Sequence, residues 1–277
     1  MNEKPASIIL TIKDSEGNII STRRGSNQQG INRVSWNMRY PGATSIKLRI
    51  KPEDNPTVVE EKRYRTTWIK EGWYPFQSWG TSGGLSGYMV APGTYTIELE
   101  ADGKTFTEVL KVLKDPSSEG SQSEIQANLE LQHKLQKDIN LATKMINEVE
   151  WIRKKLVDLN DYPSEKGDKF HLSDKIKAFD SQLAKVEDQL LQPISREGDS
   201  KSFRYPNRIY SKLSVLAGDV SKNFDFAPNK QQVEVYKNLH NRLIDIEKQL
   251  KQVLLVDLAE FNNLLQKNEI SSINSNW

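Results

Sequence analysis

Three histidines are the side chains in this sequence best suited to metal binding or acid–base chemistry. They stand at His133, His171 and His240, far apart and outside any HExxH or HxxxH pattern. Zinc sites need several ligands at short recurrent spacings, and a chain without cysteine supplies no thiolates. The sequence also lacks a nucleophile elbow, a Walker loop and a strand-linked GxGxxG. We therefore predict no metal site, no cofactor and no catalytic residue.

Carboxylates at close spacing are the next candidates, because a glycosidase needs two of them facing one bond. Glu148 and Glu150 stand two residues apart in a helical stretch, as do Asp245 and Glu247, so each pair points to different helix faces. We predict solvated surface charges at all four positions. The acidic run at 14–18 superficially resembles a calcium loop, but it lacks the twelve-residue spacing and the terminal Glu, which favours a hairpin turn.

A polar, Gly-rich stretch between residues 51 and 90 has the composition of an interaction loop. It holds five large aromatic side chains, whose faces suit the C–H faces of a sugar: Trp68, Trp73, Tyr74, Phe76 and Trp79. The alternative is that these side chains pack against the sandwich or a neighbouring domain. We favour packing, because loops of this length usually need an anchor or a functional reason to stay ordered.

The N-terminal part alternates apolar and polar side chains in short runs bounded by turn residues, which is typical of β-strands. A hairpin is predicted over residues 7–22. Val34, Trp36 and Met38 share one face of a further strand, with Trp36 in the core, and another short strand is predicted at 45–50.

Residues 91–106 form the clearest predicted hairpin. They contain a Pro-Gly turn, an alternating strand, a two-residue Asp-Gly turn at 102–103 and the start of a returning strand. A simple register places Glu108 opposite Ile97, which predicts a bulge or an edge position. About six or seven short strands without a cysteine pair favour an immunoglobulin-like antiparallel β-sandwich over residues 1–115.

A linker at 116–122 leads into a helical region, and Ser121 and Glu124 have the spacing of a capping box. Apolar residues then recur at steps of three and four, the first run being interrupted only at Gln132, and Asn229 with Gln232 begins the last run. The runs cover 125–159, 172–190, 207–222 and 233–265. They predict an antiparallel four-helix bundle over 123–270, with its two long helices paired along their whole length, and a frayed tail at 271–277.

The overall charge does not favour nucleic acid as a partner, and we do not predict one. Thirty-nine basic and 37 acidic residues give a net charge of +2, and the lysines are interleaved with acids on the predicted helix faces. No apolar run approaches the roughly 18 residues of a membrane span, so we predict no membrane-spanning segment. The first residues lack the basic and apolar regions of a signal peptide. We expect either a protein that is not exported or a fragment whose targeting signal lay upstream.

Two groups of motifs resemble a known family. Those of the sandwich are Ile8-Ile9-Leu10-Thr11-Ile12-Lys13-Asp14, Gly17-Asn18-Ile19-Ile20, Gly30-Ile31-Asn32-Arg33-Val34-Ser35-Trp36-Asn37, Arg39-Tyr40 and Ala91-Pro92-Gly93-Thr94-Tyr95-Thr96. Those of the helices are Tyr205-Pro206, Tyr210-Ser211-Lys212-Leu213, Leu216-Ala217-Gly218, Ala227-Pro228-Asn229-Lys230-Gln231-Gln232 and Val256-Asp257-Leu258-Ala259-Glu260-Phe261-Asn262. The first group resembles the immunoglobulin-like module of flagellar hook-capping proteins. In their order along the chain, both groups resemble more closely the region after the β-propeller in bacterial sortilin-like, BNR/Asp-box "glycosyl hydrolase" proteins.

The resemblance implies an accessory role. The sequence contains no S-x-D-x-G-x-T-W repeat, so the propeller and its catalytic or ligand-binding residues have no counterpart here. What it implies is a non-catalytic module of a larger exported protein, extracellular or periplasmic, that docks on the propeller or a partner protein; a cytoplasmic location stays open. Two alternatives are a carbohydrate-binding module that uses the aromatic loop and a part of a glycoside hydrolase.

Overall fold

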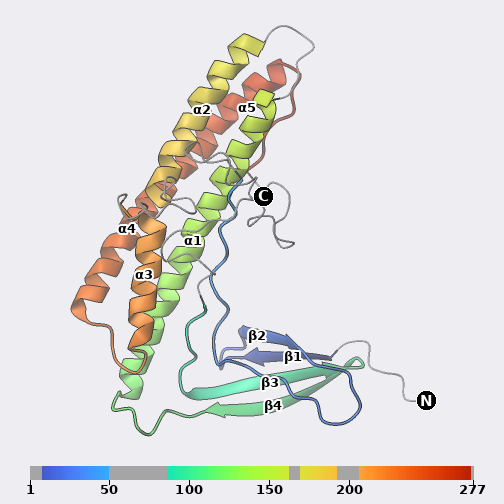
Figure 1. Cartoon of the computed structure of the whole chain (residues 1–277), viewed down its shortest axis with the longest axis vertical. Helices are drawn as coiled ribbons and strands as arrows, with labels where there is room; N and C mark the ends of the chain where they lie inside the picture. Colours follow the sequence, from blue (N-terminus) through green and yellow to red (C-terminus); the bar gives the residue numbers. More distant parts are fainter. Residues whose placement is uncertain (1–7, 50–85, 162–168, 192–205, 276–277) are drawn as a thin grey trace, which may run out of the picture. The chain divides into compact units, whose positions relative to one another are not determined.

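The computed structural model describes residues 8–49, 86–161, 169–191 and 206–275 (Figure 1). These residues form two compact units. One contains residues 8–43, 86–134 and 218–232, and the other contains 44–49, 135–161, 169–191, 206–217 and 233–275. The predicted linker at 116–122 stays a prediction. A four-stranded antiparallel sheet comes first in the chain and the helices follow, so the architecture combines β and α structure.

The sheet contains β1 (Ile8–Lys13), β2 (Ile19–Arg24), β3 (Gly93–Ala101) and β4 (Lys104–Val112). Their order is β2-β1-β3-β4, and every neighbouring pair is antiparallel. The chain leaves β2, returns some seventy residues later as β3 beside β1, and ends the sheet with β4 at its margin (Figure 1).

Both hairpin turns have the predicted chemistry. The Asp14 carboxylate accepts hydrogen bonds from the main-chain nitrogens of Glu16 at 3.0 Å and Asn18 at 2.8 Å, so it serves the turn between β1 and β2. Between β3 and β4, Asp102 and Gly103 have φ values of 51° and 70°, the left-handed conformation that a two-residue type I′ turn requires. This turn fixes the register, and Glu108 lies opposite Ile97 on the edge strand β4, as the edge alternative predicted.

One face of the sheet carries the core of the first unit. Ile12, Ile20 and Tyr95 from the strands and Val90 from the segment before β3 are buried together. Burying side chains of this size contributes about 1.5–3 kcal/mol each. Trp36, Tyr40 and other partly buried side chains pack against this cluster, with the Trp36 ring edge-on to Tyr95 at a centroid distance of 5.9 Å. Trp36, which was predicted to lie in the core, is therefore at the margin of the core, partly buried and packed against it.

The predicted strand at 34–38 does not form, and the described part of the other, residues 45–49, contains a single bridge residue, Leu48, in place of a strand. Val34 and Trp36 are partly buried and alternate with exposed neighbours, but Met38 is exposed and adopts a φ of 54°, which ends the extended run. Two hydrogen bonds follow, from Tyr40 N to Tyr88 O and from Val90 N to Met38 O, each 2.9 Å, around a single bridge between Arg39 and Met89. The pairing is too short to count as a strand, and residues 45–49 take a different partner, described below.

The helices are α1 (Gln122–Asp161), α2 (Lys169–Leu190), α3 (Ile209–Lys222), α4 (Lys230–Gln252) and α5 (Leu258–Lys267). A π-helical turn, η3 (Val253–Asp257), joins α4 to α5 without a break. Both predicted N-terminal caps form. Ser121 and Glu124 exchange side-chain to main-chain bonds of 2.8 and 3.2 Å, and Asn229 and Gln232 exchange bonds of 2.8 and 3.0 Å.

Contacts between the helices give their directions. Gln189 near the end of α2 bonds to Gln249 in α4 at 2.9 Å, whereas Phe179, earlier in α2, stacks on Phe261 in α5 at 5.2 Å. Helix α2 is therefore antiparallel to the α4–α5 helix. Figure 1 shows α1 also running opposite to α2, so the two long helices point the same way.

Helix α3 runs onward from α2 instead of turning back. Arg208, just before α3, pairs with Asp188 near the end of α2 at 2.9 Å, and Figure 1 shows α3 continuing in the direction of α2. The prediction of helices that alternate in direction therefore does not describe the order α2 then α3. The sequence pattern could not show this, because an apolar stripe fixes a helix face and not its direction.

Candidate functional site

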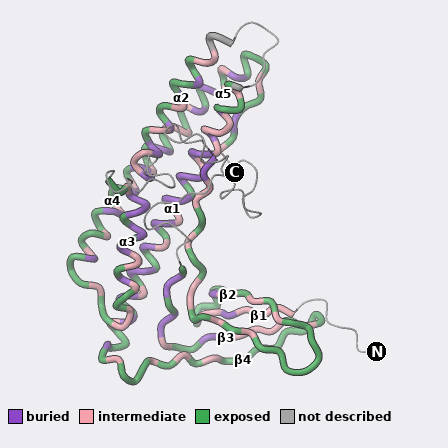
Figure 2. The backbone as a smooth tube through the Cα atoms, viewed as in Figure 1, coloured by how far each residue is buried: buried purple, intermediate pink, exposed green. Residues whose placement is uncertain are grey.

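The middle of α1 is the most deeply buried part of the helices (Figure 2). Between Ala142 and Ile152, only Lys144 is exposed. Three polar residues in this stretch, Thr143, Asn147 and Glu150, have no solvent exposure at all. The prediction of a solvated charge is wrong for Glu150. It is also wrong for Glu148, which is half-buried and whose pKa is raised by burial, an effect opposed by a hydrogen bond with Ser275 and by Lys144.

Asn147 binds an extended stretch of main chain, residues 44–49. Its Oδ1 accepts a hydrogen bond from the nitrogen of Lys47 at 2.6 Å, and its Nδ2 donates to the carbonyl of Ser45 at 3.1 Å. A carboxamide with one donor and one acceptor can satisfy both groups of an extended backbone in this way. Within the segment predicted as a strand at 45–50, Ser45 and Lys47 thus have a helix side chain as hydrogen-bond partner, whereas Leu48 is a bridge residue.

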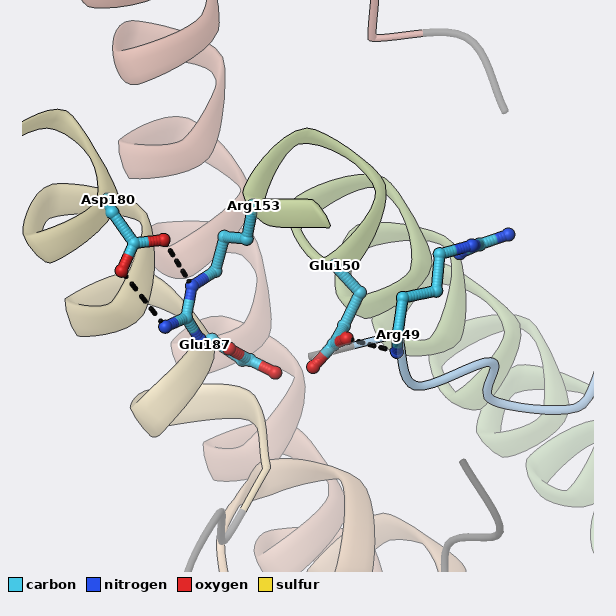
Figure 3. Close-up of polar contacts among 5 residues, drawn as sticks. All are labelled: Arg49, Glu150, Arg153, Asp180 and Glu187. Carbon is cyan, nitrogen blue, oxygen red and sulfur yellow. Dashed lines mark hydrogen bonds and ion pairs between the residues drawn. The ribbon is translucent and has the colours of Figure 1, made fainter. Parts of the chain in front are cut away.

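Two further side chains of α1 extend this contact along the same helix face. The nitrogen of Thr44 donates to Asn140 Oδ1 at 2.8 Å, and the nitrogen of Arg49 donates to Glu150 Oε2 at 2.5 Å (Figure 3). Residues 140, 147 and 150 are separated by steps of seven and three, which keeps them on one side of a helix. Side chains of α1 thus supply hydrogen-bond partners to the main chain of segment 44–49 at four of its six residues.

The side chain of Arg49 turns from this contact toward Trp151. Its guanidinium lies 5.3 Å from the centroid of the indole ring, and Lys155 Nζ lies 4.5 Å from the same ring. Both distances suit cation–π attraction. Burial lowers the pKa of Arg49, and the nearby Glu150 carboxylate opposes that change.

Arg153, one turn after Glu150, is the centre of an ion cluster between α1 and α2 (Figure 3). Its Nε and Nη2 donate to the two oxygens of Asp180 at 2.8 and 3.1 Å, and its Nη1 donates to Glu187 Oε2 at 2.5 Å. Burial lowers the pKa of Arg153, but the ion pairs with Asp180 and Glu187 outweigh burial and raise it overall. Asp180 and Glu187 are seven residues apart, so one face of α2 presents both carboxylates.

Glu187 is almost inaccessible to solvent, with only 2% of its side chain exposed. Its second oxygen, Oε1, is buried and has no hydrogen-bond partner among the residues that the structure describes. With a guanidinium held against both acids, Asp180 and Glu187 act as charged acceptors. This arrangement stabilises the packing of α1 against α2 through ion pairs.

The two histidines whose side chains are described serve different units. His240 Nδ1 lies 2.9 Å from Asp138 Oδ2, and the Asp138 carboxylate is nearly buried. Burial, followed by the charge of Asp138, raises the pKa of the nearby Tyr236 to about 12. In the other unit, His133 Nδ1 lies 2.9 Å from the Tyr88 hydroxyl. Each histidine thus has its own partner, and the described residues contain no group of three His, Cys, Asp or Glu suited to a metal ion.

The other predicted residues are the second pair of carboxylates, the third histidine and the aromatic loop. Asp245 is exposed beside Lys248, as predicted. The prediction of a solvated charge is wrong for Glu247, which is half-buried and pairs with Lys251 at 2.7 Å. The side chain of His171 lies outside the described residues. The five aromatic residues of the predicted interaction loop, Trp68, Trp73, Tyr74, Phe76 and Trp79, also lie outside the described residues, so their role stays a prediction.

The sequence interpretation missed Asn140, Asn147, Glu150 and Arg153. A signal for all four was present, because each follows an apolar stripe residue by one position, the first three after Ile139, Ile146 and Val149. A polar row running beside an apolar stripe through several turns indicates a helix that is covered on two sides. Arg153 follows Ile152 in the same way.

Comparisons of the chain with protein-family models, with curated proteins and with solved structures found no match. Among the described helices, none combines the length and the apolar composition needed to cross a membrane.

Proposed function

We propose that this chain is a non-catalytic accessory and interaction module of a larger exported bacterial protein of the sortilin-like β-propeller type. It docks on the propeller or on a partner protein in the extracellular or periplasmic space. The observation that carries the proposal is the use of the buried polar side chains. Asn147 and Glu150 bind segment 44–49, and Arg153 binds α2. The buried polar side chains that could otherwise take part in catalysis are thus used to join parts of the chain.

The finer architecture belongs to the same proposal. We infer an immunoglobulin-like sandwich followed by a helical bundle. The sandwich is supported by a sheet with one apolar face and by the bridge between Arg39 and Met89, whose flanking residues Tyr40 and Val90 pack with the core on that face. The bundle is supported by the contacts of α1 and α5 with α2.

Docking is assigned to the aromatic loop between residues 51 and 90. Large aromatic side chains combine apolar area with few rotatable bonds, and for that reason they dominate many protein interfaces. The resemblance places this module directly after a propeller, which makes the propeller the first partner to test.

Calorimetric titration of the chain with a purified sortilin-like β-propeller tests this assignment. We expect saturable binding that weakens at least about tenfold when Trp73 and Trp79 are both replaced by Ala, as for interface anchors. The matched control is Phe226→Ala, which removes an aromatic side chain that is 48% exposed elsewhere in the chain. Equal binding by the double variant and the control would contradict the docking role of the loop.

The two alternative functions give different results in the same preparation. A carbohydrate-binding module predicts saturable changes of tryptophan fluorescence with polysaccharides and no binding to the propeller. A glycoside hydrolase predicts turnover of aryl glycosides or sialosides that a single carboxylate substitution abolishes. Either result would replace the proposed function.

A further inference from the structure

The two edges of the sheet are built differently. The β2 edge is six residues long, its pairing with β1 is interrupted by a register shift at Ile12 and Lys13, and it ends in Arg23 and Arg24. Short length, irregular pairing and charge are the means by which proteins prevent edge strands from pairing with other chains. The β4 edge has nine residues, continuous register with β3 and no proline. By length and regular pairing β4 is the more open edge, although it also carries charge, at Lys104, Glu108 and Lys111.

Strand β4 also exposes apolar side chains on both faces of the sheet. Residues 104–109 are all exposed, with Phe106 at 56% and Val109 at 65%. Phe106 lies opposite Leu99 on the apolar face, and Val109 lies opposite Thr96 on the other face. Single exposed apolar residues are common on protein surfaces, but here two of them lie on one long, regularly paired edge strand.

The hairpin turn determines which main-chain groups of β4 point outward. In a two-residue hairpin the residues that flank the turn form a hydrogen-bonded pair, here Ala101 and Lys104. Every second residue from Lys104 therefore bonds to β3, and the residues between them, Thr105, Thr107, Val109 and Lys111, direct their N–H and C=O groups to the free side. In the part of the chain that the structure describes, no strand lies beyond β4.

We propose that β4 is a self-association edge, on which β4 of a second copy of this chain pairs antiparallel around a two-fold axis at Val109. Symmetric pairing of identical edges brings residues of the same sheet face together. An axis at Val109 sets Val109 opposite its own copy, Phe106 opposite Val112 and Thr107 opposite Lys111. Two exposed apolar side chains are then covered, and no like charges face each other directly within Lys104–Val112.

Other axes on this strand fit less well. An axis at Glu108 sets the two Glu108 carboxylates opposite each other, which destabilises a strand pair. An axis at Phe106 or Thr107 shortens the overlap and sets Val109 opposite a turn glycine or Thr105. This inference goes beyond the proposed function, because it concerns a second copy of the chain and a surface outside the aromatic loop.

Sedimentation velocity over a concentration series of the full chain tests the proposal. We expect a reversible monomer–dimer equilibrium that Val109→Lys shifts to monomer, because two lysines then meet at the axis. The matched control is Ile19→Lys on the other edge, where the replaced side chain is 60% exposed, and it should dimerise like the unmodified chain. Monomer alone up to millimolar concentration, or a dimer that Val109→Lys leaves intact, would overturn the proposal. Thr107→Lys, which faces Lys111 of the other copy, serves as a second variant if Val109→Lys fails to fold.

The absence of cysteine gives a direct test of the register. A nitroxide on Val109→Cys should show strong dipolar broadening in the dimer, since the two labels meet at the axis, and a nitroxide on Ile19→Cys should not. A dimer without broadening at position 109 would show that another surface associates and would overturn the assignment to β4.

Discussion

The Glu150 carboxylate accepts a hydrogen bond from the main-chain nitrogen of Arg49, a residue 101 positions earlier in the sequence. A buried carboxylate is stable only when its oxygens have donors, and here a backbone amide supplies one of them. The bond ties the segment after the first strands to the centre of α1.

Replacing Asn147 with Ala should lower the free energy of unfolding by about 1–3 kcal/mol, because the amide of Lys47 and the carbonyl of Ser45 both lose a buried partner. Urea denaturation followed by circular dichroism measures the change. Asn241→Ala, at an exposed position of α4, is the control and should be neutral within about 0.5 kcal/mol. Equal stability of the two variants would show that segment 44–49 does not depend on Asn147.

Replacing Arg153 with Met should cost about 3–5 kcal/mol, since Asp180 and Glu187 would keep their charges without a counter-ion. Adding Asp180→Asn and Glu187→Gln should recover part of the loss, because the uncompensated charges are then removed. Chemical denaturation measures both variants, and Lys154→Met on the same helix is the control. If Arg153→Met were as stable as Lys154→Met, the ion cluster of Arg153, Asp180 and Glu187 would have no structural role.

Asn128→Asp should be more damaging than a simple loss of hydrogen bonds. The Asn128 Nδ2 donates to the carbonyls of Val220, Asn223 and Phe226 at 2.9 to 3.2 Å, and a carboxylate would place negative charge against these oxygens. We expect a loss above the roughly 1–3 kcal/mol of an unsatisfied buried group. Faster amide exchange at 223–226 is the measurement, with Gln126→Asp as the exposed control; unchanged exchange would count against this arrangement.

Two glycines give opposite expectations for the same substitution. A Cβ at Gly87 would overlap the carbonyl oxygen of Tyr40, whereas a Cβ at Gly218 in α3 meets nothing within 4 Å. Gly87→Ala should therefore destabilise the protein, and Gly218→Ala should stabilise it by about 0.5–1 kcal/mol through helix propensity. Thermal unfolding of both variants measures the difference. A melting temperature that falls for Gly218→Ala and rises for Gly87→Ala would contradict the packing described.

Stability should fall at alkaline pH. The pKa of Tyr236 is raised to about 12, first by burial and then by Asp138, so the folded state favours the neutral phenol. The stabilisation of the folded state by the neutral Tyr236 phenol is complete below the ordinary tyrosine pKa near 10. It is lost as the pH rises through about 12. Tyr236→Phe should flatten the decline of stability between about pH 10 and 12, measured by denaturation at each pH. An unchanged slope would assign the decline to other groups, of which Tyr95, also raised to about 12 by burial, is one.

Local chemistry in the sequence predicted local structure well. The turn at Asp102 and Gly103, the capping pair Ser121 and Glu124, and the cap at Asn229 depend on residues within a few positions of one another, so their interactions can be deduced from spacing alone. Gln132 is instructive in another way. It interrupts the apolar stripe, yet it is buried, and its Nε2 donates to Asn128 Oδ1.

Contacts over long sequence distances were the part that spacing could not predict. Glu150 carries the same charge pattern as an exposed helix residue, and only the placement of segment 44–49 makes it a buried acceptor. The same limit applies to helix direction, because the stripe of α3 is equally compatible with either direction. The full strand order of the sheet is likewise not contained in the alternation of a single strand, although Glu108 opposite Ile97 did indicate an edge position for β4.

The π-helical turn at Val253–Asp257 has a consequence for how this helix tolerates insertions and deletions. The buried residues Leu243, Ile246 and Leu250 follow steps of three and four, but the next fully buried residue, Leu258, comes eight positions later. Two α-helical turns would span about seven residues, so this interval contains one extra residue. The wider π-helical turn accommodates it, and the Leu255 side chain in that turn is 76% exposed. Deleting Leu255 should therefore leave an uninterrupted α-helix with Phe261 and Leu265 still facing inward, while a deletion elsewhere in α4 or α5 would rotate that face out of the core.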